Sequence, residues 1–344
     1  MLSKKILVNP FEKLLKEKPW ILADGATGTQ LFKKGLTAGE SPEIWNETKP
    51  LLIEEHYKSS IEAGSDLILT NSFGSNYSRL KLHNSESEAF RLSKISAEIA
   101  RNLSDQSPKH VIVAGSMGPT GEILQPVGDF SKSLAIEIFH EQAEGLKSGG
   151  SDILWIETMS SLDEFDAAVQ AADLAQMPFC GTMSFDTSGR TMMGVTSVEF
   201  CDFAKNCSKN LIAYGANCGV GASDLLRTIL GLKANTLPII AKGNAGIPKY
   251  SDGKIYYNGT PEIMADYACL ARDCGATIIG GCCGTTPLHL RHMNHALHSR
   301  SRGPLPTHQL IKNILGDFSS TFDGTGETLK PSRTSKRRSR RLIT

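Results

Sequence analysis

Eight short apolar segments, each closed by small or polar residues, recur along the chain. In order they read WILADG (20–25), DLILTNSFG (66–74), VIVAGSMG (111–118), DILWIETM (152–159), PFCGTMSFD (178–186), LIAYGANCG (211–219), LPIIAKGNAG (237–246) and ATIIGGCCG (276–284). Near-continuous apolar runs of this length are typical of strands buried on both faces of a parallel sheet. Segments with helical periodicity, such as 50–64 and 161–176, separate them. Eight strand–helix units predict an α/β fold, a (β/α)8 TIM barrel.

The last part of the chain has a different composition. From about residue 301 it is rich in Gly, Ser, Thr and Pro, and it ends in RTSKRRSRRLIT (333–344). We therefore expect residues 1–300 to form the barrel domain and 301–344 to form a C-terminal extension, a short helical docking piece followed by a partly disordered basic tail. A basic cluster can bind RNA or anionic surfaces, but we favour a solvated tail and expect no nucleic-acid partner.

Composition and charge place the rest of the chain among soluble proteins. The 344 residues are 40% hydrophobic and 21% charged, which is enough to bury one large core. Six of the 37 basic residues lie in 333–344, so the remainder carries 31 basic residues against 36 acidic ones. Lysines interrupt the first apolar stretches, and no segment reaches the roughly 18 apolar residues of a membrane span. We expect a cytoplasmic protein without a membrane partner, whose eight cysteines stay reduced.

The polar residues with chemical potential stand mostly at the C-terminal ends of the predicted strands. They are Asp24, Asn71, Ser116, Glu157, Asp186, Asn217, Cys218, Asn244, Cys282 and Cys283. In a (β/α)8 barrel these strand ends meet at one face, where active sites are built. A single polar residue can simply mark where a strand stops, but so many at one rim predict a functional site.

Three cysteines dominate this rim. Cys282 and Cys283 are adjacent in GGCCG (280–284), and Cys218 holds the matching position in the sixth segment. Neighbouring side chains of a regular strand point to opposite faces, so we expect the glycines of the motif to permit the twist that lets both thiols reach one ion. Three thiolates with an open fourth position are typical of a catalytic zinc site. A redox pair and an inert pair of core thiols are the alternatives.

Two other groups of possible metal ligands are weaker candidates. The remaining cysteines lack CxxC spacing, and we interpret them as buried small apolar residues or free thiols; they are Cys180, Cys201, Cys207, Cys269 and Cys274. Four histidines follow one another at steps of three residues: His289, His292, His295 and His298. Each such step drifts by about 60° on an α-helix, so the four do not share one face and are not expected to bind a metal.

Seven motifs, in order, resemble the homocysteine S-methyltransferase family. They are DGATGT (24–29), TNSF (70–73), GSMGPTGE (115–122), IET (156–158), GANCG (215–219), KGNAG (242–246) and GGCCG (280–284). The resemblance runs from about residue 18 to 300, and it implies a zinc-dependent barrel enzyme. The stretches LADGATGTQLFKKGL (22–36) and GRTMMGV (189–195) are similar to the bacterial betaine–homocysteine methyltransferase branch. That branch would transfer a methyl group from glycine betaine to homocysteine, giving methionine and dimethylglycine.

The resemblance also implies roles for individual residues. The zinc ligands would be Cys218, Cys282 and Cys283, with the homocysteine sulfur in the open position. Asp24 and Glu157 would hold the amino group of homocysteine, with the backbone amides of Gly25, Ala26 and Thr27 near its carboxylate. Asn217, next to a zinc ligand, would order the site from behind. Asn71, at the same rim, is a further candidate for substrate binding.

The identity of the methyl donor is the open part of this interpretation. An onium donor is commonly bound by aromatic faces, and we expect Trp45 to supply one, with Phe73, Phe185 and Tyr77 as other candidates and packing as the alternative role for Trp45. Thr158 follows Glu157, where animal betaine-using relatives have an aromatic residue. A sulfonium donor, S-methylmethionine or dimethylsulfoniopropionate, is therefore the alternative.

The expected donor is small and free. The chain is short for additional folate- and cobalamin-binding domains and has no DxHxxG motif, which favours direct transfer from a small molecule. A binding barrel without activity is a further alternative, disfavoured by the presence of Asp24, Glu157 and the three cysteines. Oligomers are common among relatives, and the sequence leaves a homo-oligomer open.

Overall fold

A closed ring of parallel strands forms the centre of the molecule. The computed structural model describes residues 9–232, 236–251 and 254–323. The strands of the ring are β1 (Ile21–Leu22), β2 (Leu67–Leu69), β3 (Ile112–Met117), β4 (Ile153–Met159), β5 (Phe179–Met183), β6 (Leu211–Cys218), β7 (Ile239–Gly243) and β10 (Ala276–Gly281). Their order is β1-β10-β7-β6-β5-β4-β3-β2, and a parallel bridge between Ala23 and Leu67 joins the two ends. The predicted (β/α)8 barrel is confirmed, and each strand lies inside a predicted segment.

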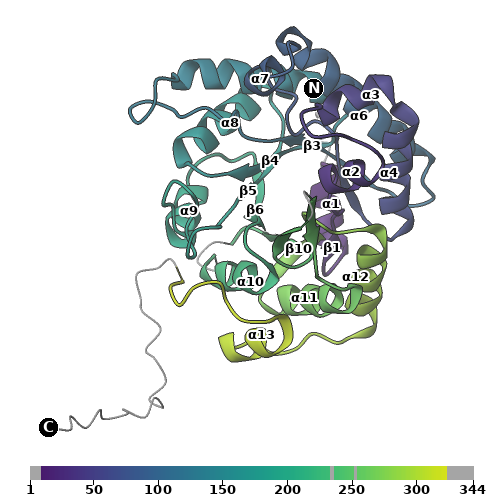
Figure 1. Cartoon of the computed structure of the whole chain (residues 1–344), viewed down its shortest axis with the longest axis vertical. Helices are drawn as coiled ribbons and strands as arrows, with labels where there is room; N and C mark the ends of the chain where they lie inside the picture. The colour runs from purple at the N-terminus through teal and green to yellow at the C-terminus, as the bar shows by residue number, and fades with distance from the viewer. Residues whose placement is uncertain (1–8, 233–235, 252–253, 324–344) are drawn as a thin grey trace, which may run out of the picture.

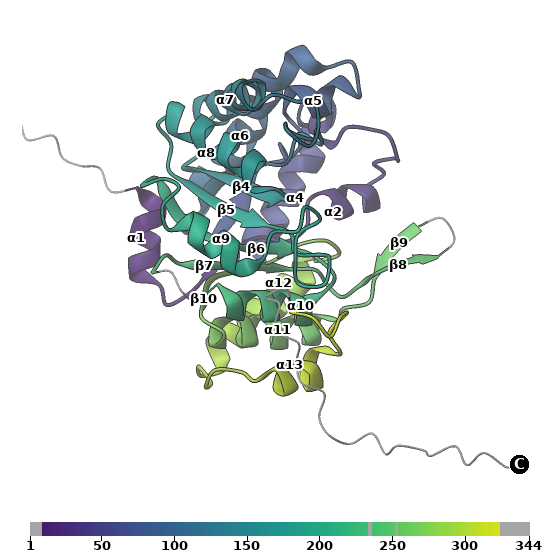
Figure 2. The ribbon, with the colours of Figure 1, turned by 90° about the vertical axis from the view of Figure 1, so that its left-hand side faces the viewer.

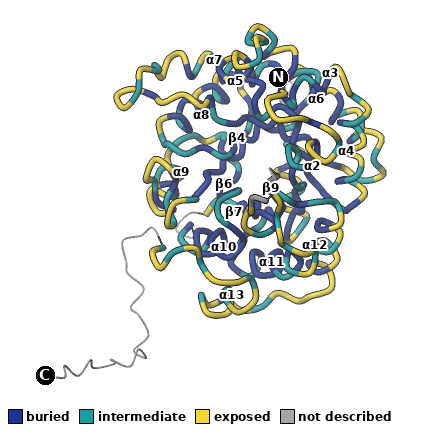
Figure 3. Tube along the Cα trace, viewed as in Figure 1, coloured by how far each residue is buried: buried dark blue, intermediate teal, exposed yellow. Residues whose placement is uncertain are grey.

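A layer of helices surrounds the strands (Figure 1). The long helices that follow successive strands of the ring are α4 (Pro50–Glu62), α6 (Ala89–Gln106), α7 (Lys132–Ser148), α8 (Leu162–Leu174), α9 (Ser197–Ala204), α10 (Ala222–Gly231), α11 (Pro261–Asp273) and α12 (Pro287–Ser299). Shorter elements at the rim are α2 (Gly28–Lys33), η1 (Pro42–Ile44), α3 (Trp45–Thr48), α5 (Tyr77–Lys81) and η2 (Glu86–Glu88). The strands are buried and the outer faces of the helices are exposed (Figure 3), as the near-continuous apolar runs of the strands predict.

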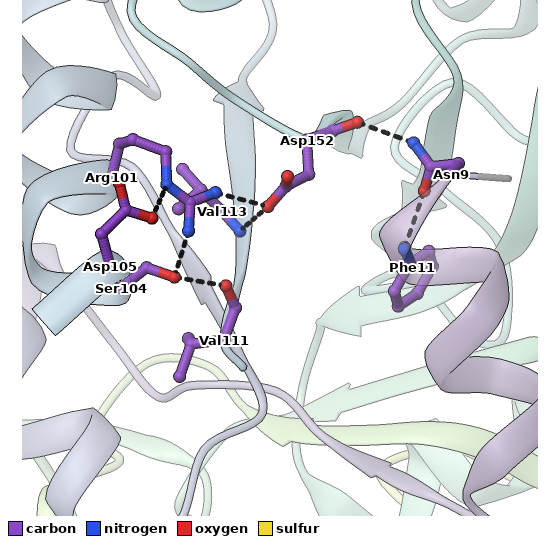
Figure 4. Close-up of polar contacts among 8 residues, drawn as sticks. All are labelled: Asn9, Phe11, Arg101, Ser104, Asp105, Val111, Val113 and Asp152. Carbon is purple, nitrogen blue, oxygen red and sulfur yellow. Dashed lines mark hydrogen bonds and ion pairs between the residues drawn. The ribbon is translucent and has the colours of Figure 1, made fainter. Parts of the chain in front are cut away.

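The N-terminal end of the barrel is closed by α1 (Pro10–Glu17). Its Phe11 is fully buried among inward-facing residues of the strands, including Ile21 and Trp155. Asn9 caps the helix by accepting a hydrogen bond from the Phe11 amide, and its own amide donates to the carbonyl oxygen of Asp152 (3.0 Å) (Figure 4). The N-terminal segment is thereby fixed to the start of β4.

An ion pair at the same end ties helix α6 to strands β3 and β4. Arg101 donates to Asp152 Oδ2 (3.0 Å), and the same oxygen accepts the Val113 amide (2.8 Å) (Figure 4). These charges bind parts of the scaffold to one another, at the end of the barrel opposite to the predicted functional rim.

The C-terminal rim carries a hairpin that the strand prediction did not include. Strands β8 (Pro248–Ser251) and β9 (Lys254–Tyr257) pair antiparallel and project from the body at the end opposite to α1 (Figure 2). The hairpin lies between β7 and α11 and returns to the rim at Tyr257. It therefore adds side chains to the mouth of the barrel.

The described part of the C-terminal extension packs against the barrel. Helix α13 (His308–Leu315) buries Ile311, and the guanidinium carbon of Arg227 in α10 lies 4.6 Å from the ring centroid of Phe318. Arg227 also donates to the carbonyl oxygen of Ser320 (2.8 Å). The basic stretch 333–344 lies outside the described residues. Among the described helices, none has both the length and the apolar character required to cross a membrane.

Candidate metal and substrate site

Three thiols converge at the C-terminal rim. Cys218 ends β6, and Cys282 and Cys283 directly follow β10, while β7 separates these two strands in the ring. The three Sγ atoms lie within 4.8 Å of one another, with 3.7 Å between those of Cys218 and Cys283. A tetrahedral site with metal–sulfur bonds of about 2.3 Å has sulfur–sulfur edges of about 3.8 Å, so the spacing fits a thiolate-bound metal ion. No second group of metal-ligand side chains is found in the parts of the chain that the structure describes.

Local backbone geometry brings the adjacent cysteines together. Strand β10 ends at Gly281, and Cys282 then starts a turn in which its carbonyl accepts the amide of Thr285 (3.1 Å). Gly284 in that turn has a φ of 79°, and Cys218 itself has a φ of 61°, a value rare for a residue with a side chain. The thiols therefore meet because the chain leaves the strand before Cys282.

Gly280 and Gly281 do not supply the backbone twist that we expected of the glycines in GGCCG. Neither Gly280 nor Gly281 has a positive φ. They are required by close packing instead, since a Cβ atom at Gly281 would lie 2.3 Å from Cγ2 of Thr285, and one at Gly280 would lie 2.9 Å from Cβ of Ala23. The twist that we predicted at these two positions is thus supplied at Gly284 and Cys218.

Hydrogen bonds among the thiols favour negative charge on Cys283. The pKa of Cys283 is lowered to about 3, because the thiols of Cys218 and Cys282 and the hydroxyl of Tyr257 donate to its sulfur. The pKa of Cys218 is raised, since it shares its proton with the sulfur atoms of Cys282 and Cys283. Tyr257, from the rim hairpin, is thus a contact of the cluster that motif reasoning missed.

A buried ion pair lies beside the cluster. The Lys242 ammonium of β7 donates to Asp24 Oδ1 (2.5 Å), and Asp24 Oδ2 accepts the Leu69 amide (2.7 Å). Burial lowers the pKa of Lys242, but Asp24 and Glu157 outweigh this and raise it, so the lysine stays charged. Each Asp24 oxygen therefore already accepts one hydrogen bond within the chain. Lys242 opens the KGNAG motif at a strand end, and this position is the signal in the sequence that could have identified it as a site residue.

Glu157 lies across the same interior space at the end of β4. It is 8% exposed, and its Oε1 accepts a hydrogen bond from the Ser116 hydroxyl of β3. Burial raises the pKa of Glu157 to about 7, and the charge of Lys242 only partly offsets this. Its second oxygen has no hydrogen-bond partner among the described residues, which leaves it able to accept a proton donor from a ligand.

Three successive backbone amides after β1 are unpaired among the described residues. The amides of Gly25, Ala26 and Thr27 have no acceptor within the described residues. Thr27 precedes helix α2, and its hydroxyl lies 3.2 Å from Nε2 of His56. Successive free N–H groups of this kind can bind a carboxylate.

Asn217 connects the thiols to β4. This fully buried residue accepts the Thr158 amide with Oδ1 (3.0 Å) and donates to the Thr158 hydroxyl (2.8 Å), while Nδ2 lies 3.9 Å from Cys282 Sγ. Asn217 thus contacts Cys282, one of the candidate metal ligands, and its role in ordering the site stays a prediction.

Two predicted rim residues lie away from the opening. Trp45 is 3% exposed, packs in a cluster with Leu31 and Ile53, and has the Lys49 ammonium 3.7 Å from its ring centroid. Asn71 is 4% exposed and donates to the Pro42 carbonyl (2.8 Å) and to Asn46 Oδ1 (3.0 Å). These contacts favour structural roles for both side chains.

The other residues that we singled out in the sequence also lie outside the cysteine cluster. Asn244 donates to the Gly219 carbonyl (2.8 Å) and so braces the loop after Cys218. Asp186 is half-buried and accepts a hydrogen bond from the hydroxyl of its neighbour Thr187 (3.3 Å). The cysteines outside the cluster are buried or half-buried, and His289 bonds to Thr286 and Gly259.

Comparison with known proteins identifies the family of the chain. The sequence model of the family described as homocysteine S-methyltransferase matches residues 21–297. A methionine synthase of Mycobacterium leprae is 29% identical over 91% of this chain and 27% of its own length, and one of Mycobacterium tuberculosis is 30% identical over 82% and 25%. The chain therefore spans about a quarter of the length of these relatives.

Solved structures share the fold. The metallated form of the Escherichia coli homocysteine methyltransferase MmuM superposes with a TM-score of 0.70 at 23% identity, covering 83% of this chain and 99% of that one. Its oxidized form gives a TM-score of 0.68 at 23% identity, covering 84% and 99%.

Proposed function

Because the chain belongs to the homocysteine S-methyltransferase family, we propose that it is a zinc-dependent enzyme that methylates the sulfur of homocysteine to give methionine. The convergence of Cys218, Cys282 and Cys283 on one point carries the proposal. These thiolates would hold the zinc ion, which would supply the Lewis acidity needed to deprotonate the substrate thiol, since a free thiol with a pKa of roughly 8.5 is mostly protonated at neutral pH.

The residues around the cluster suit an amino acid. Glu157 has an oxygen available for the ammonium group, whereas Asp24 is held by Lys242 and Leu69. We therefore assign the ammonium contact to Glu157 and give Asp24 the role of fixing Lys242 and the end of β2. The free amides of residues 25–27 are the proposed contacts of the substrate carboxylate.

The charge of the site favours a cationic methyl donor. With zinc bound, the three thiolates and the metal together would still carry a net negative charge. Ionised Asp24 and Glu157 add to this charge, and Lys242 is the cation that opposes them there among the described residues, so the mouth is anionic when these groups are ionised. Tyr257 contacts the cluster directly and brings an aromatic ring to it. An onium donor meets both features.

Glycine betaine is the proposed donor. The homocysteine sulfur attacks a methyl carbon in line; the new S–C bond forms as the C–N bond breaks, and the nitrogen keeps the electron pair, which leaves dimethylglycine. A sulfonium donor, S-methylmethionine or dimethylsulfoniopropionate, fits the same charge and is the second candidate, since Thr158 stands where an aromatic cage residue is expected.

An assay of methionine formation tests the proposal. Purified protein, loaded with zinc under reducing conditions, is given homocysteine with glycine betaine, dimethylsulfoniopropionate or S-methylmethionine in turn. We expect turnover with betaine and none with Cys218→Ser. Turnover with a sulfonium compound but not with betaine would show that the donor is a sulfonium. Full activity of the zinc-free protein would refute the role of zinc.

A further inference from the structure

Strand β4 contains a bulge at the residues that follow its buried run. Ile156 pairs with Gly181 and Met159 with Met183, so Glu157 and Thr158 together face the single residue Thr182 of β5. Thr158 has a φ of 62°, a conformation that β-branched residues rarely adopt. Bulges of this kind re-aim a side chain beside an active site. The bulge therefore sets the direction of the Glu157 carboxylate.

The side chain of Asn217 holds the bulge in place. Asn217 belongs to β6, which is separated from β4 by β5, so its amide spans a strand to reach Thr158. It accepts a hydrogen bond from the Thr158 amide (3.0 Å), a backbone donor that lies in the bulge, and it donates one to the Thr158 hydroxyl (2.8 Å). Asn217 is fully buried, so water does not replace these bonds.

The other contacts of Asn217 lead to the metal ligands. Its Nδ2 lies 3.9 Å from the Cys282 sulfur, and its backbone continues into Cys218, which also has a left-handed φ of 61°. The side-chain amide of Asn217 thus contacts the bulge next to Glu157 and the sulfur of Cys282. Its backbone is bonded directly to Cys218.

From this geometry we propose that Thr158 is a positioning residue whose bonds to Asn217 hold Glu157 and the cysteine cluster in one arrangement, so that metal binding and homocysteine binding depend on the same clamp. The inference rests on the proposed function for its homocysteine part only. Without the Thr158 hydroxyl, the buried Asn217 amide loses an acceptor and can rotate, which releases its hold on the cysteine side as well.

Three substitutions separate this role from ordinary packing. Thr158→Val is isosteric and removes only the hydroxyl, Thr158→Ser keeps it, and Thr158→Gly removes it while relieving the positive φ. The matched control is Thr182→Val on the facing strand, because the Thr182 hydroxyl is buried and has no hydrogen-bond partner. The readouts are zinc affinity, from competition with a chromophoric chelator, and the KM for homocysteine.

We expect Thr158→Val to bind zinc about 10- to 100-fold more weakly, the range found when partners behind metal ligands are removed, and to raise the homocysteine KM by about 10-fold or more. Thr158→Ser and Thr182→Val should stay within about twofold of the unaltered protein. Thr158→Gly should lose zinc affinity without losing thermal stability, which a packing role does not predict, and it provides the test if Thr158→Val does not fold.

The proposed role of Thr158 would be wrong if Thr158→Val left both the zinc affinity and the homocysteine KM unchanged. A change in melting temperature alone would contradict it equally. If the unaltered protein shows no homocysteine methylation, the proposed function fails, and the zinc affinities of the four variants still decide whether Thr158 positions the cysteines. A loss of zinc affinity with an unchanged homocysteine KM would overturn the coupling.

Discussion

The Lys242 ammonium lies 2.5 Å from the Asp24 carboxylate, and both side chains are buried beside the cysteine cluster. The pair joins the end of β7 to the end of β1, and through the Leu69 amide to β2. The carboxylate that family resemblance assigns to the substrate amine thus also bonds to two groups of the chain itself. Among the residues that the structure describes, Lys242 is the cation that pairs with the acidic groups of this cluster, which are Asp24, Glu157 and the three cysteines.

Removal of one partner of this pair should be more damaging than removal of both. Lys242→Met leaves the Asp24 carboxylate buried without a cation, and we expect a loss of about 3–5 kcal/mol in the free energy of unfolding. Asp24→Asn combined with Lys242→Met should lose less than Lys242→Met alone. Urea denaturation of the single and double variants measures both quantities; additive losses would show that the two charges do not stabilise each other.

Glu157 should link homocysteine binding to pH. Its pKa of about 7 means that the carboxylate that binds the ammonium is present above this pH and lost below it. The KM for homocysteine should therefore rise as the pH falls from 8 to 6. Glu157→Gln should raise the KM by about 10- to 100-fold, the worth of a hydrogen bond to a charged group, and should remove this pH dependence; a variant with an unaltered profile would contradict the assignment.

Burial of the Glu157 carboxylate should also lower the free energy of unfolding at neutral pH. The folded pKa of Glu157 is raised above the ordinary 4.5, so the folded state binds its proton more tightly and stability falls as the pH rises from 4.5 to 7. The penalty reaches about 3 kcal/mol above pH 7. Glu157→Gln should be more stable than the unaltered protein at pH 8 and equally stable at pH 4.5, as measured by urea denaturation at both values.

Trp45 should act through packing. The indole is buried in a hydrophobic cluster and covered by Lys49, so Trp45→Ala should cost about 3–5 kcal/mol of folding free energy. It should affect the KM values of homocysteine and of the methyl donor alike, and Trp45→Phe should restore most of the stability. A rise in the KM of the donor alone, with stability retained, would show that Trp45 binds the methyl donor.

The sequence predicts the barrel and the cysteine cluster because both depend on strand order. Parallel strands place their C-terminal ends at one face, so Cys218 and the Cys282–Cys283 pair can be brought together without knowledge of any side-chain contact. The position of Asn217 behind the cluster follows for the same reason, since it directly precedes Cys218.

The contacts within the site could not be predicted in this way. The Lys242–Asp24 pair joins residues 218 positions apart, and the Asn217–Thr158 bonds cross an intervening strand. The bulge at Thr158 adds one residue to β4 without any glycine to signal it. Trp45 lies in a short rim helix whose orientation depends on tertiary packing, and the periodicity of the sequence alone does not distinguish its buried side from its open side.

X-ray absorption at the zinc edge tests the central claim most directly, because it counts the sulfur atoms bound to the metal before and after homocysteine is added. For the unaltered protein, purified under reducing conditions, we predict about one zinc per chain. Its shell should contain three sulfur atoms at about 2.3 Å, rising to four when homocysteine is present. Cys218→Ser should lose the metal, whereas Cys207→Ser, outside the cluster, should retain it. A zinc-free protein that methylates homocysteine, or a sulfur count that does not change on its addition, would contradict the account.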